Sequence, residues 1–518
     1  MDFPLVVTAA EMRAADQAIA RALGVPTLRL METAGAGVAD VVRREIAGVA
    51  GEVVIVCGGG SNGGDGFVAA RHLARPGLPV RVLLAAPRAK IRGDAAAALA
   101  ALEAAGGAVI EEGSGWLDEA IWRRRLGDAP LAAVVDAIFG TGFHGPVRDV
   151  PAAAVAAMNA AGGRKIAIDV PSGLDADTGR SVGAVFRADV TATMGARKLG
   201  LCIGESAPVG RVEVVDLGLP VEGVVGRVRC RLLDAPGIAA RLPGRNPDAH
   251  KGSKGHVLVV AGSAGKTGAA FLTGTAALRS GAGLVTVAST AAGQAALDAK
   301  VVELMTARHS ESEEIEPVAA EQAIERLAGK AQAVALGPGI PTGEGMRAVV
   351  RELAWRLTVP MVIDADGLNA LGTDAADILA RARAPRVLTP HPGEMGRLLG
   401  LSIAEVQDDR IGRARALALA SKAVVVLKGA HTIVAAPGGD VFINPAATSA
   451  LATAGSGDVL TGVVGALLAR GLDALSAAQV GVYVHGAAGE ALAPRLGDGV
   501  LAGDLPLEIA GVMAHLAG

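Results

Sequence analysis

Short runs of hydrophobic, often β-branched residues recur along the chain, and each is followed by a glycine-rich turn and an alanine-rich stretch. This alternation is typical of strands and helices in a mostly parallel sheet, whose buried strands are apolar on both faces. It predicts an α/β fold with ligands at the C-terminal ends of the strands, where the loops are rich in Gly, Asp, Ser and Asn. In the first half, the predicted strands are 52–57, 80–84, 133–138, 165–170 and 211–216.

The alternation stops between about residues 221 and 254, where Pro, Gly and Arg are scattered through an irregular segment. We place a domain boundary there, near residue 230, which gives domains of 1–228 and 229–518. No motif is shared between the halves, so the sequence predicts two different enzymes joined in one chain. In the second half, the predicted strands are 256–261, 285–288, 333–336, 361–364, 387–389, 424–427 and 432–435.

Length and charge restrict the possible functions. A chain of 518 residues is too long for one ordinary hydrophobic core, so at least two domains are expected. The formal net charge is −3 and no long basic run occurs, which argues against nucleic acid or an anionic membrane as a partner. We also expect neither a signal peptide nor a membrane-spanning segment.

The cysteines indicate a reducing compartment. Cys57, Cys202 and Cys230 are odd in number and widely spaced, which fits neither a disulfide framework nor a zinc cluster. We therefore expect a cytoplasmic protein.

A glycine-rich loop, GGGSNG, begins at Gly58, after a predicted strand and before a helix. Its GxGxxG spacing is that of a dinucleotide-binding turn, although the next strand runs into 85–90 without the acidic residue that usually binds the ribose. Two alternatives remain open: an NADP-type basic site, and a tight turn that only packs a helix on a strand. The second explains the glycines but not Asn62 and Asp65.

The longer strings GGGSNGGDGFVAARHL, VVDAIFGTGFHGP and IAIDVPSGLDADTG resemble the NAD(P)H-hydrate epimerase family over about residues 1–225. The resemblance implies a Rossmann-like three-layer sandwich and a potassium ion, for which Asn62, Asp136 and Ser172 offer oxygen ligands. Ser61 stands where a second Asn is expected. The resemblance implies these substrate-binding residues: Ser61, Asn62, Gly63, Gly64, Asp65, Gly140, Thr141, Gly142, Phe143, His144, Gly145, Pro146 and Asp169.

Two roles are open for Asp169, which ends its predicted strand before a proline. In one it handles a proton of the substrate; in the other it only caps the next turn through Ser172 and Gly173. The turn 61–65 and the loop 140–146 supply backbone N–H groups that can hold phosphates.

The second half contains two glycine-rich strings. GSAGKT, from Gly262, ends like a P-loop, but Val260 occupies the place of the required first glycine, so a P-loop is excluded. TAGSGD, ending at Asp458, precedes a long apolar helix. Glycines before a helix leave bare N–H groups that stabilise an anion, and an aspartate there can act on the group that attacks a phosphate.

These features, with HKGSKGHVLVVAGS, AALRSGAGLVTVA, LGPG, VIDADGLNAL and TPHPGEM, resemble the NAD(P)H-hydrate dehydratase family over about residues 235–518. The resemblance implies a ribokinase-like α/β domain that uses ADP and a magnesium ion. Asp458 is its expected catalytic base, whereas His391 could instead be a loop histidine satisfied by backbone groups. The implied nucleotide-binding residues are Lys428, Gly429, Ala430, His431, Thr432 and Gly457, and the implied substrate contacts are Ala269, Gly339, His391 and Asp458.

We therefore expect a bifunctional repair enzyme. It would epimerise the R- and S-forms of hydrated NADH and NADPH and dehydrate the S-form with ADP, releasing AMP and phosphate. We expect a homo-oligomer without nucleic acid or membrane partners. A sugar or vitamin kinase and a non-catalytic dinucleotide sensor remain alternatives, and ADP is preferred to ATP through the resemblance alone.

Overall fold

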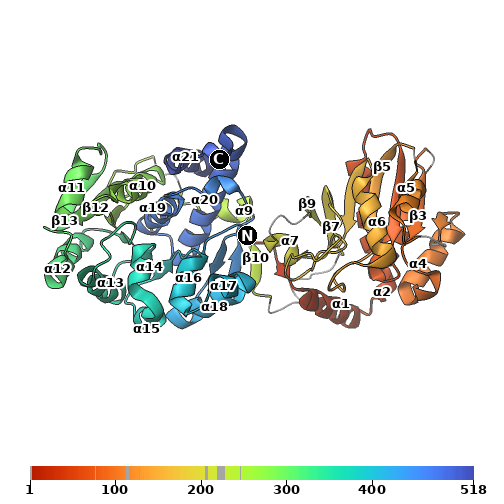
Figure 1. Cartoon of the computed structure of the whole chain (residues 1–518), viewed down its shortest axis with the longest axis horizontal. Helices are drawn as coiled ribbons and strands as arrows, with labels where there is room; N and C mark the ends of the chain where they lie inside the picture. Colours follow the sequence, from red (N-terminus) through yellow and green to blue (C-terminus); the bar gives the residue numbers. More distant parts are fainter. Residues whose placement is uncertain are drawn as a thin grey trace. The chain divides into compact units, whose positions relative to one another are not determined.

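The computed structural model describes residues 3–75, 77–111, 116–127, 129–204, 208–218, 228–244 and 247–518. The chain divides into two compact units (Figure 1). One is Leu5–Val228, and the other is Arg229–Gly518 together with the first residues of the chain, of which Phe3 and Pro4 are described. Each unit is built on its own large, mainly parallel sheet, which confirms the predicted α/β class.

In the described residues, the N-terminal unit has a seven-stranded parallel sheet of order β4-β3-β2-β5-β6-β7-β9 and a small sheet of β1 and β8. Its strands are β1 (Val6–Val7), β2 (Glu52–Cys57), β3 (Val80–Leu84), β4 (Ala108–Ile110), β5 (Leu131–Ala137), β6 (Arg164–Ile168), β7 (Val190–Met194), β8 (Arg197–Lys198) and β9 (Arg211–Val215). Its helices are α1 (Ala9–Leu23), α2 (Thr27–Glu45), α3 (Ser61–Leu73), η1 (Arg88–Lys90), α4 (Gly93–Ala104), α5 (Glu119–Leu126), α6 (Asp149–Ala160) and α7 (Gly200–Ile203).

Alternate residues of the central strands belong to two hydrophobic cores. Val53 and Ile55 of β2 pack with residues of α2, α3 and α4, whereas Val54 and Val56 pack with residues of α5 and α6 on the opposite face. Helices therefore cover both faces of the sheet, which gives the predicted three-layer sandwich.

In the described residues, the C-terminal unit has a ten-stranded sheet of order β10-β19-β18-β17-β16-β15-β14-β11-β12-β13. Only the pairs β17–β18 and β18–β19 are antiparallel. Its strands are β10 (Cys230–Leu232), β11 (His256–Val260), β12 (Leu284–Thr290), β13 (Met305–Ser310), β14 (Ala333–Leu336), β15 (Met361–Ile363), β16 (Arg386–Leu388), β17 (Val424–Leu427), β18 (Ile433–Ala435) and β19 (Val441–Ile443). Its helices are α9 (Ala235–Ala239), α10 (Thr267–Arg279), α11 (Ala291–Asp298), α12 (Pro317–Ala328), α13 (Glu344–Arg356), α14 (Asp366–Leu371), η2 (Gly372–Asp374), α15 (Ala375–Leu379), α16 (Pro392–Leu399), α17 (Ile403–Asp408), α18 (Arg410–Ser421), η3 (Ser449–Leu451), α19 (Ser456–Ala469), α20 (Ala474–Leu496), η4 (Gly497–Gly499), η5 (Ala502–Asp504) and α21 (Leu505–Leu516).

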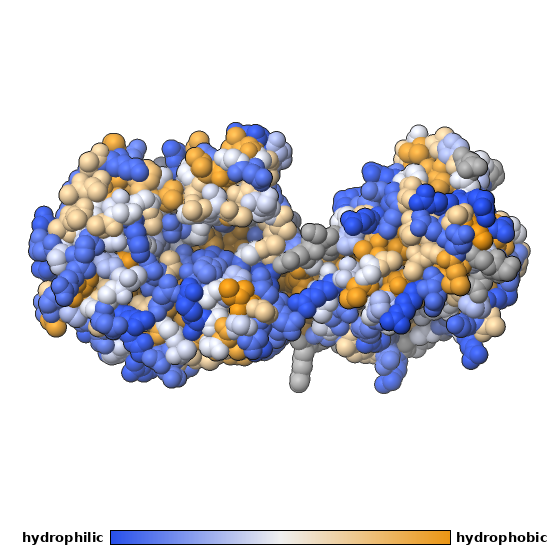
Figure 2. All heavy atoms as spheres, viewed as in Figure 1, coloured by the Kyte–Doolittle hydropathy of each residue, from blue (hydrophilic) through white to orange (hydrophobic). Residues whose placement is uncertain are grey.

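Every strand that the sequence predicts is present, with ends that differ by at most two residues in most cases. Among the described strands, the sequence misses β1, β4, β7, β8, β10, β13 and β19. The predicted turn 61–65 is the first part of α3, because the helix begins directly after Gly60. Hydrophilic residues are interspersed with hydrophobic ones on the face shown in Figure 2. No helix among the described residues is long and apolar enough to cross a membrane.

The domain boundary needs two corrections. The segment 221–254, predicted to be irregular, contains β10 and α9 in its described part, while 221–227 and 245–246 lie outside the described residues. The first residues, assigned by sequence to the N-terminal domain, belong to the C-terminal unit. Sequence patterning cannot detect this, because two or three residues before the first helix form no periodic pattern.

Phe3 is part of the hydrophobic core of the C-terminal unit and is 1% exposed. Its ring packs edge-on against Phe442, with centroids 5.8 Å apart, and the Arg241 guanidinium lies 4.1 Å above it. The main chain is fixed as well, because the Leu232 amide donates to the Pro4 carbonyl at 2.9 Å. The N-terminal residues therefore complete a unit whose other residues begin more than two hundred positions later.

We predict that Phe3→Ala lowers the free energy of unfolding of the C-terminal unit by about 3–5 kcal/mol, the usual cost of removing a buried aromatic ring. Urea unfolding of the full chain measures this. Pro4→Ala is the matched control, because Pro4 is exposed and contributes its carbonyl. A loss below about 1 kcal/mol for Phe3→Ala would show that the ring is dispensable.

Candidate active sites

The N-terminal unit contains a cavity of about 680 Å³ at the C-terminal ends of β2, β5 and β6. Its wall is formed by the start of α3, the loop after β5, the residue after β6, and side chains from α1 and α2. This volume is typical of a small-molecule site. The predicted residues that line it are Ser61, Asn62, Asp65, Gly140, Thr141, Gly142, Phe143 and Asp169.

Gly63 and Gly64, predicted to bind substrate, do not line the cavity and instead allow close packing of α3. A Cβ on Gly63 would lie 2.0 Å from the Gly58 carbonyl oxygen, and one on Gly64 would lie 2.6 Å from the Met31 side chain. Glycine at these positions lets α3 approach β2 and α2 closely. The other predicted residues that do not line the cavity are His144, Gly145 and Pro146.

A buried lysine, Lys198, faces this cavity and is 1% exposed. Its Nζ lies 2.6 Å from Asp169 Oδ1 and donates to Thr193 Oγ1 and the Met194 carbonyl at 3.0 and 2.8 Å. Burying an ammonium is costly unless it is paired and hydrogen-bonded, so this pair fixes the position of Asp169. Asp169 does not cap the following turn, because the Ser172 amide donates to Asp136 Oδ2 at 2.7 Å.

Two further carboxylates, Asp65 and Asp16, line the same cavity. Burial raises the pKa of Asp65 well above its usual range, and the nearby charge of Asp169 raises it further, against the opposing effect of Lys198. Burial also raises the pKa of Asp16. One ammonium therefore balances several carboxyl groups, and a carboxyl group of this cavity takes up a proton at a higher pH than it would in solution.

Asn62, Asp136 and Ser172 come together around the peptide groups of Phe139. Ser172 Oγ donates to Asp136 Oδ1 at 2.7 Å and accepts from the Phe139 amide at 2.9 Å, while Asn62 Nδ2 donates to the Phe139 carbonyl at 2.9 Å. Burial raises the pKa of Asp136 to about 6, against hydrogen bonds from Ser172 and Ile138 that lower it. The buried Asn62 Oδ1 has no hydrogen-bond partner in the described structure. A Cβ on Gly140 would lie 3.3 Å from Asn62 Oδ1 and 3.2 Å from Asp169 Oδ2, so this unpartnered oxygen lies close to a carboxylate, which fits a hard cation.

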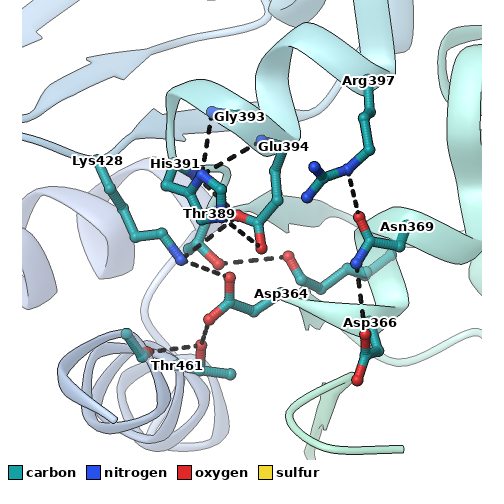
Figure 3. A network of polar contacts seen from close by, with 12 residues as sticks. Asp364, Asp366, Asn369, Thr389, His391, Gly393, Glu394, Arg397, Lys428 and Thr461 are labelled. Atoms are coloured by element: carbon teal, nitrogen blue, oxygen red, sulfur yellow. Dashed lines mark hydrogen bonds and ion pairs between the residues drawn. The ribbon is translucent and has the colours of Figure 1, made fainter. Parts of the chain in front are cut away.

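The C-terminal unit has a network of polar contacts at the ends of β15, β16 and β17 (Figure 3). Asp364 is 1% exposed and lies at its centre. Lys428 Nζ is 2.7 Å from Asp364 Oδ1 and 3.7 Å from Glu394 Oε2, and Thr461 Oγ1 donates to Asp364 Oδ2 at 2.7 Å. Burial alone would lower the pKa of Lys428, but the Asp364 and Glu394 carboxylates raise it above its usual value.

Asp458 lies in the first turn of α19, which begins after Gly455 without any side-chain cap. Burial raises the pKa of Asp458 to about 7, the charge of Asp364 adds to the rise, and Lys428 opposes it. A Cβ on Gly457 would lie 3.1 Å from Lys428 Nζ, so glycine keeps the space before the helix open. The helix therefore offers free N–H groups beside a carboxyl group that titrates near neutrality.

His391 has a structural role that the sequence leaves open. Its Nδ1 accepts from the Gly393 and Glu394 amides at 3.0 and 3.3 Å and so caps α16, while the His391 amide donates to Glu394 Oε2 at 2.8 Å. Since Nδ1 accepts, the neutral ring carries its proton on Nε2. The ring is half exposed, and its Nε2 lies 3.4 Å from Glu394 Oε1, so both ring nitrogens face polar groups of α16.

The remaining predicted residues of the C-terminal unit are the substrate contacts Gly339 and Ala269 and the nucleotide loop that starts at Lys428. Gly339, with φ +66°, lies beside Ala269, because a Cβ at Gly339 would be 3.2 Å from the Ala269 Cβ. Lys428 points into the Asp364 network, whereas the loop that follows it is fixed by Thr432 Oγ1, which donates to the Gly429 carbonyl at 2.8 Å. The remaining loop residues are Ala430 and His431.

The positive-φ residues other than glycine include Asp169, Ala365 and His431, with φ of +66°, +49° and +51°. Asp169 lies in the N-terminal cavity, Ala365 separates Asp364 from Asp366, and His431 lies in the loop that follows Lys428. Such backbone costs about 1–3 kcal/mol per residue and is typical of functional sites, where it directs side chains.

Comparisons with known proteins match both halves. A family model described as YjeF-related protein N-terminus matches residues 27–200, and one described as NAD(P)H-hydrate dehydratase matches residues 257–510. A bifunctional NAD(P)H-hydrate repair enzyme of Moorella thermoacetica is 43% identical over 508 residues, which cover 96% of this chain and 95% of that protein. The chain belongs to the family of bifunctional NAD(P)H-hydrate repair enzymes.

Other members of the repair-enzyme family are also similar. The Escherichia coli protein of this name is 35% identical over 498 residues, covering 96% of this chain and 91% of its own. A solved ADP/ATP-dependent NAD(P)H-hydrate dehydratase from Bacillus subtilis is 30% identical, covers 55% of this chain and 96% of its own, and has a TM-score of 0.47. The family assignment confirms the bifunctional enzyme expected from the sequence, with an epimerase-type half and a dehydratase half.

Sequence reasoning missed Lys198, Asp16 and Asp364, although each faces a site. Lys198 is the second residue of a two-residue strand, β8, and has no motif of its own. Asp364 lies within the string VIDADGLNAL and directly follows a buried strand, which is a position where a carboxylate faces the ligand crevice. The position of Asp364 directly after a buried strand could therefore have identified it as a site residue.

We predict that Lys198→Met lowers epimerase activity by 10²-fold or more, because Asp169 loses the ammonium that stabilises its carboxylate. Dehydration of a purified single epimer should be unchanged. Lys90→Met, which changes an exposed lysine of η1, is the control. Epimerisation within about threefold of the parent would show that Lys198 is only a buried structural lysine.

Proposed function

We propose that the N-terminal unit interconverts the two epimers of hydrated NADH and NADPH, and that the C-terminal unit dehydrates the S-epimer with ADP. The observation that carries this proposal is that each unit has its own cluster at the strand ends of its sheet, in which one lysine is paired with a carboxylate and further carboxyl groups lie nearby. Each cluster lies within a half of the chain that matches one of the two family models.

Epimerisation inverts the ring carbon that carries the added hydroxyl, so a bond to that carbon must break and re-form. This carbon is a hemiaminal: when the hydroxyl loses its proton and the ring nitrogen gains one, the C–N bond breaks to give an aldehyde, and reclosure on the other face of the aldehyde returns both protons. The Asp169 carboxylate, paired with Lys198, supplies a base, and Asp65, whose pKa burial raises well above its usual range, supplies an acid. The carboxyl groups of both residues lie in one cavity, so both can reach the same bound ring.

For the potassium ion we propose Asn62, Asp136 and Ser172 as ligands. The unpartnered Asn62 Oδ1 and the buried Asp136 carboxylate support this assignment. The Phe139 amide and carbonyl form hydrogen bonds with Ser172 and Asn62. A cation held by these side chains would therefore order the loop that includes Gly140 to Phe143.

Dehydration needs an activated leaving group, because hydroxide leaves poorly and phosphate leaves well. We propose that Asp458 removes the proton of the hydrate hydroxyl, whose oxygen then attacks the β-phosphorus of ADP and releases AMP. The ring nitrogen next expels inorganic phosphate, and loss of a ring proton restores the double bond. Free N–H groups at the start of α19 would stabilise the phosphoryl group in transit.

For a magnesium ion, Asp364 and Glu394 are the protein ligands that we propose. Among the described residues no group of three or more His, Cys, Asp or Glu side chains could hold a metal alone. This fits magnesium, which is usually bound by one or two carboxylates together with substrate phosphates and serves to neutralise their charge. The loop Lys428–Thr432 and Gly457 would seat the nucleotide, and Ala269, Gly339 and His391 would contact the hydrate.

We also propose a cytoplasmic location and a homo-oligomeric state. In the described structure none of the three cysteines forms a disulfide, which supports a reducing compartment. Sedimentation of the purified protein tests the oligomeric state.

The cation assignment predicts a pH-dependent stabilisation by potassium. Because the pKa of Asp136 is raised to about 6, its carboxylate is ionised above that pH and neutral below it, and the cation binds the ionised form. Potassium should therefore raise the melting temperature at pH 8 by roughly 2–8 °C relative to choline, equivalent to about 1–2 kcal/mol in a domain of this size. The increase should disappear below about pH 6 and in Asp136→Ala.

Asp40→Asn, in an exposed ion pair, is the control for this experiment and should keep the full potassium effect. A potassium effect that persists in Asp136→Ala would place the cation elsewhere.

Asp458→Asn tests the dehydratase mechanism. It should slow dehydration by roughly 10²–10⁴-fold with epimerisation and ADP binding preserved, because only the proton acceptor is lost. The parent rate should rise with pH through about 7, as the Asp458 carboxyl group ionises. Stopped-flow recovery of dihydropyridine absorbance, with a purified single epimer, measures the rate of the variant and the pH dependence of the parent rate. A variant within about threefold of the parent would exclude Asp458 as the base.

A further inference from the structure

A chain of four side chains crosses the C-terminal unit from the start of α10 to α16. Lys266 Nζ lies 3.2 Å from Asp366 Oδ2, and Asn369 Nδ2 is 3.4 Å from Asp366 Oδ1. Asn369 Oδ1 then accepts from Arg397 Nε at 2.8 Å. Figure 3 shows Asp366, Asn369 and Arg397 following one another beside the Asp364 network. We call these four residues the cationic rim.

The cationic rim lies on the side of the site that we assign to the hydrate. A Cβ on Gly339 would be 2.9 Å from the Lys266 carbonyl oxygen and 3.2 Å from Ala269 Cβ, so Lys266 adjoins both proposed substrate contacts. Arg397 projects from α16, the helix that His391 caps. In Figure 3, Lys428 and Arg397 lie on opposite sides of His391, which separates the rim from the proposed nucleotide loop.

The rim has charge available for a ligand. Lys266 and Arg397 contribute two positive charges and Asp366 one negative charge, which leaves a net charge of +1. The Lys266 side chain is 49% exposed and Arg397 is exposed. Arg397 uses only Nε for Asn369, and its two terminal amino groups bind no other residue in the described part of the chain. A guanidinium held at one edge, with its other donors free, suits a phosphate oxygen.

We propose that Lys266 and Arg397 bind the pyrophosphate of the hydrated dinucleotide, and that Asp366 and Asn369 hold the two cations in position. This inference rests on the proposed dehydratase function. In both hydrated NADH and hydrated NADPH, the pyrophosphate is one ribose away from the reacting ring. Lys266 adjoins the proposed substrate contacts Gly339 and Ala269, and Arg397 projects from the helix that His391 caps, so both cations lie beside residues assigned to the hydrate. Lys266 of the Gly-Lys-Thr string would thus bind a phosphate, although the string is not a P-loop.

Kinetics of Arg397→Met and Lys266→Met test the proposal, with saturating ADP and three hydrated substrates: NADH, NADPH, and reduced nicotinamide riboside, which has no phosphate. Each variant should raise KM about tenfold or more for hydrated NADH and hydrated NADPH, because charge-assisted hydrogen bonds to the pyrophosphate are lost. The kcat should stay within about twofold, since these bonds are the same in substrate and transition state. For the riboside hydrate, kcat/KM should not change.

Arg347→Met, which alters an exposed arginine of α13 paired with Glu344, is the matched control and should change no constant. Arg397→Lys, which keeps the charge and loses the guanidinium plane, should give an intermediate KM and guards against misfolding of the methionine variant. Melting temperatures verify that each variant is folded.

Three results would overturn the proposal. An unchanged KM for both dinucleotide hydrates would show that the rim binds no phosphate of the substrate. An effect on hydrated NADPH alone would assign the rim to the 2′-phosphate, and a raised KM for ADP alone would assign it to the nucleotide. If instead the parent protein dehydrates none of the three substrates, the proposed function fails, which is a different outcome from all of these.

Discussion

A buried ammonium group must have a carboxylate beside it, and this constraint determines the chemistry of both units. Lys198 satisfies it with Asp169, and Lys428 satisfies it with Asp364. Each lysine balances one negative charge, but more than one further carboxyl group lies close by. Removing water penalises the surplus negative charge, so a carboxyl group near each lysine takes up a proton at a higher pH than it would in solution. The two units, which share no motif, therefore each contain a site whose carboxyl groups take up and release protons at a higher pH than in solution.

The parallel sheets place these groups together. Apolar strands run through the core, and the first residues that can be polar are those just past the strand ends, where Asp169 and Asp364 stand. Strained backbone then directs the side chains. Asp169 itself has a positive φ, and the positive φ of Ala365 lets Asp364 face the buried lysine while Asp366 joins the cationic rim. Local strain is tolerated because well-packed cores lie behind both sites.

The sequence predicts features that depend on local patterns and fails for those that depend on distant partners. Most central strands were located to within two residues because buried parallel strands are continuous apolar runs, whereas short edge strands such as β4 and β13 carry no such signal. The Asn62, Asp136 and Ser172 cluster was proposed from motifs alone. Lys198 was missed because its role comes from Asp169, which lies 29 positions earlier in the chain. Phe3 was misassigned because its partners, including Phe442, are far away in sequence.

Each unit has its own site, and under the proposed function the two sites act independently and in succession on the hydrate. Mixing two disabled variants tests it: Lys198→Met, which keeps the dehydratase site, and Asp458→Asn, which keeps the epimerase site. With both epimers of hydrated NADH and ADP, Lys198→Met alone should restore dihydropyridine absorbance only until the S-epimer is consumed, after which spontaneous epimerisation limits the rate. An equimolar mixture of the variants should convert both epimers at a rate that increases with the amount of Asp458→Asn. A mixture that performs no better than Lys198→Met alone would contradict the account.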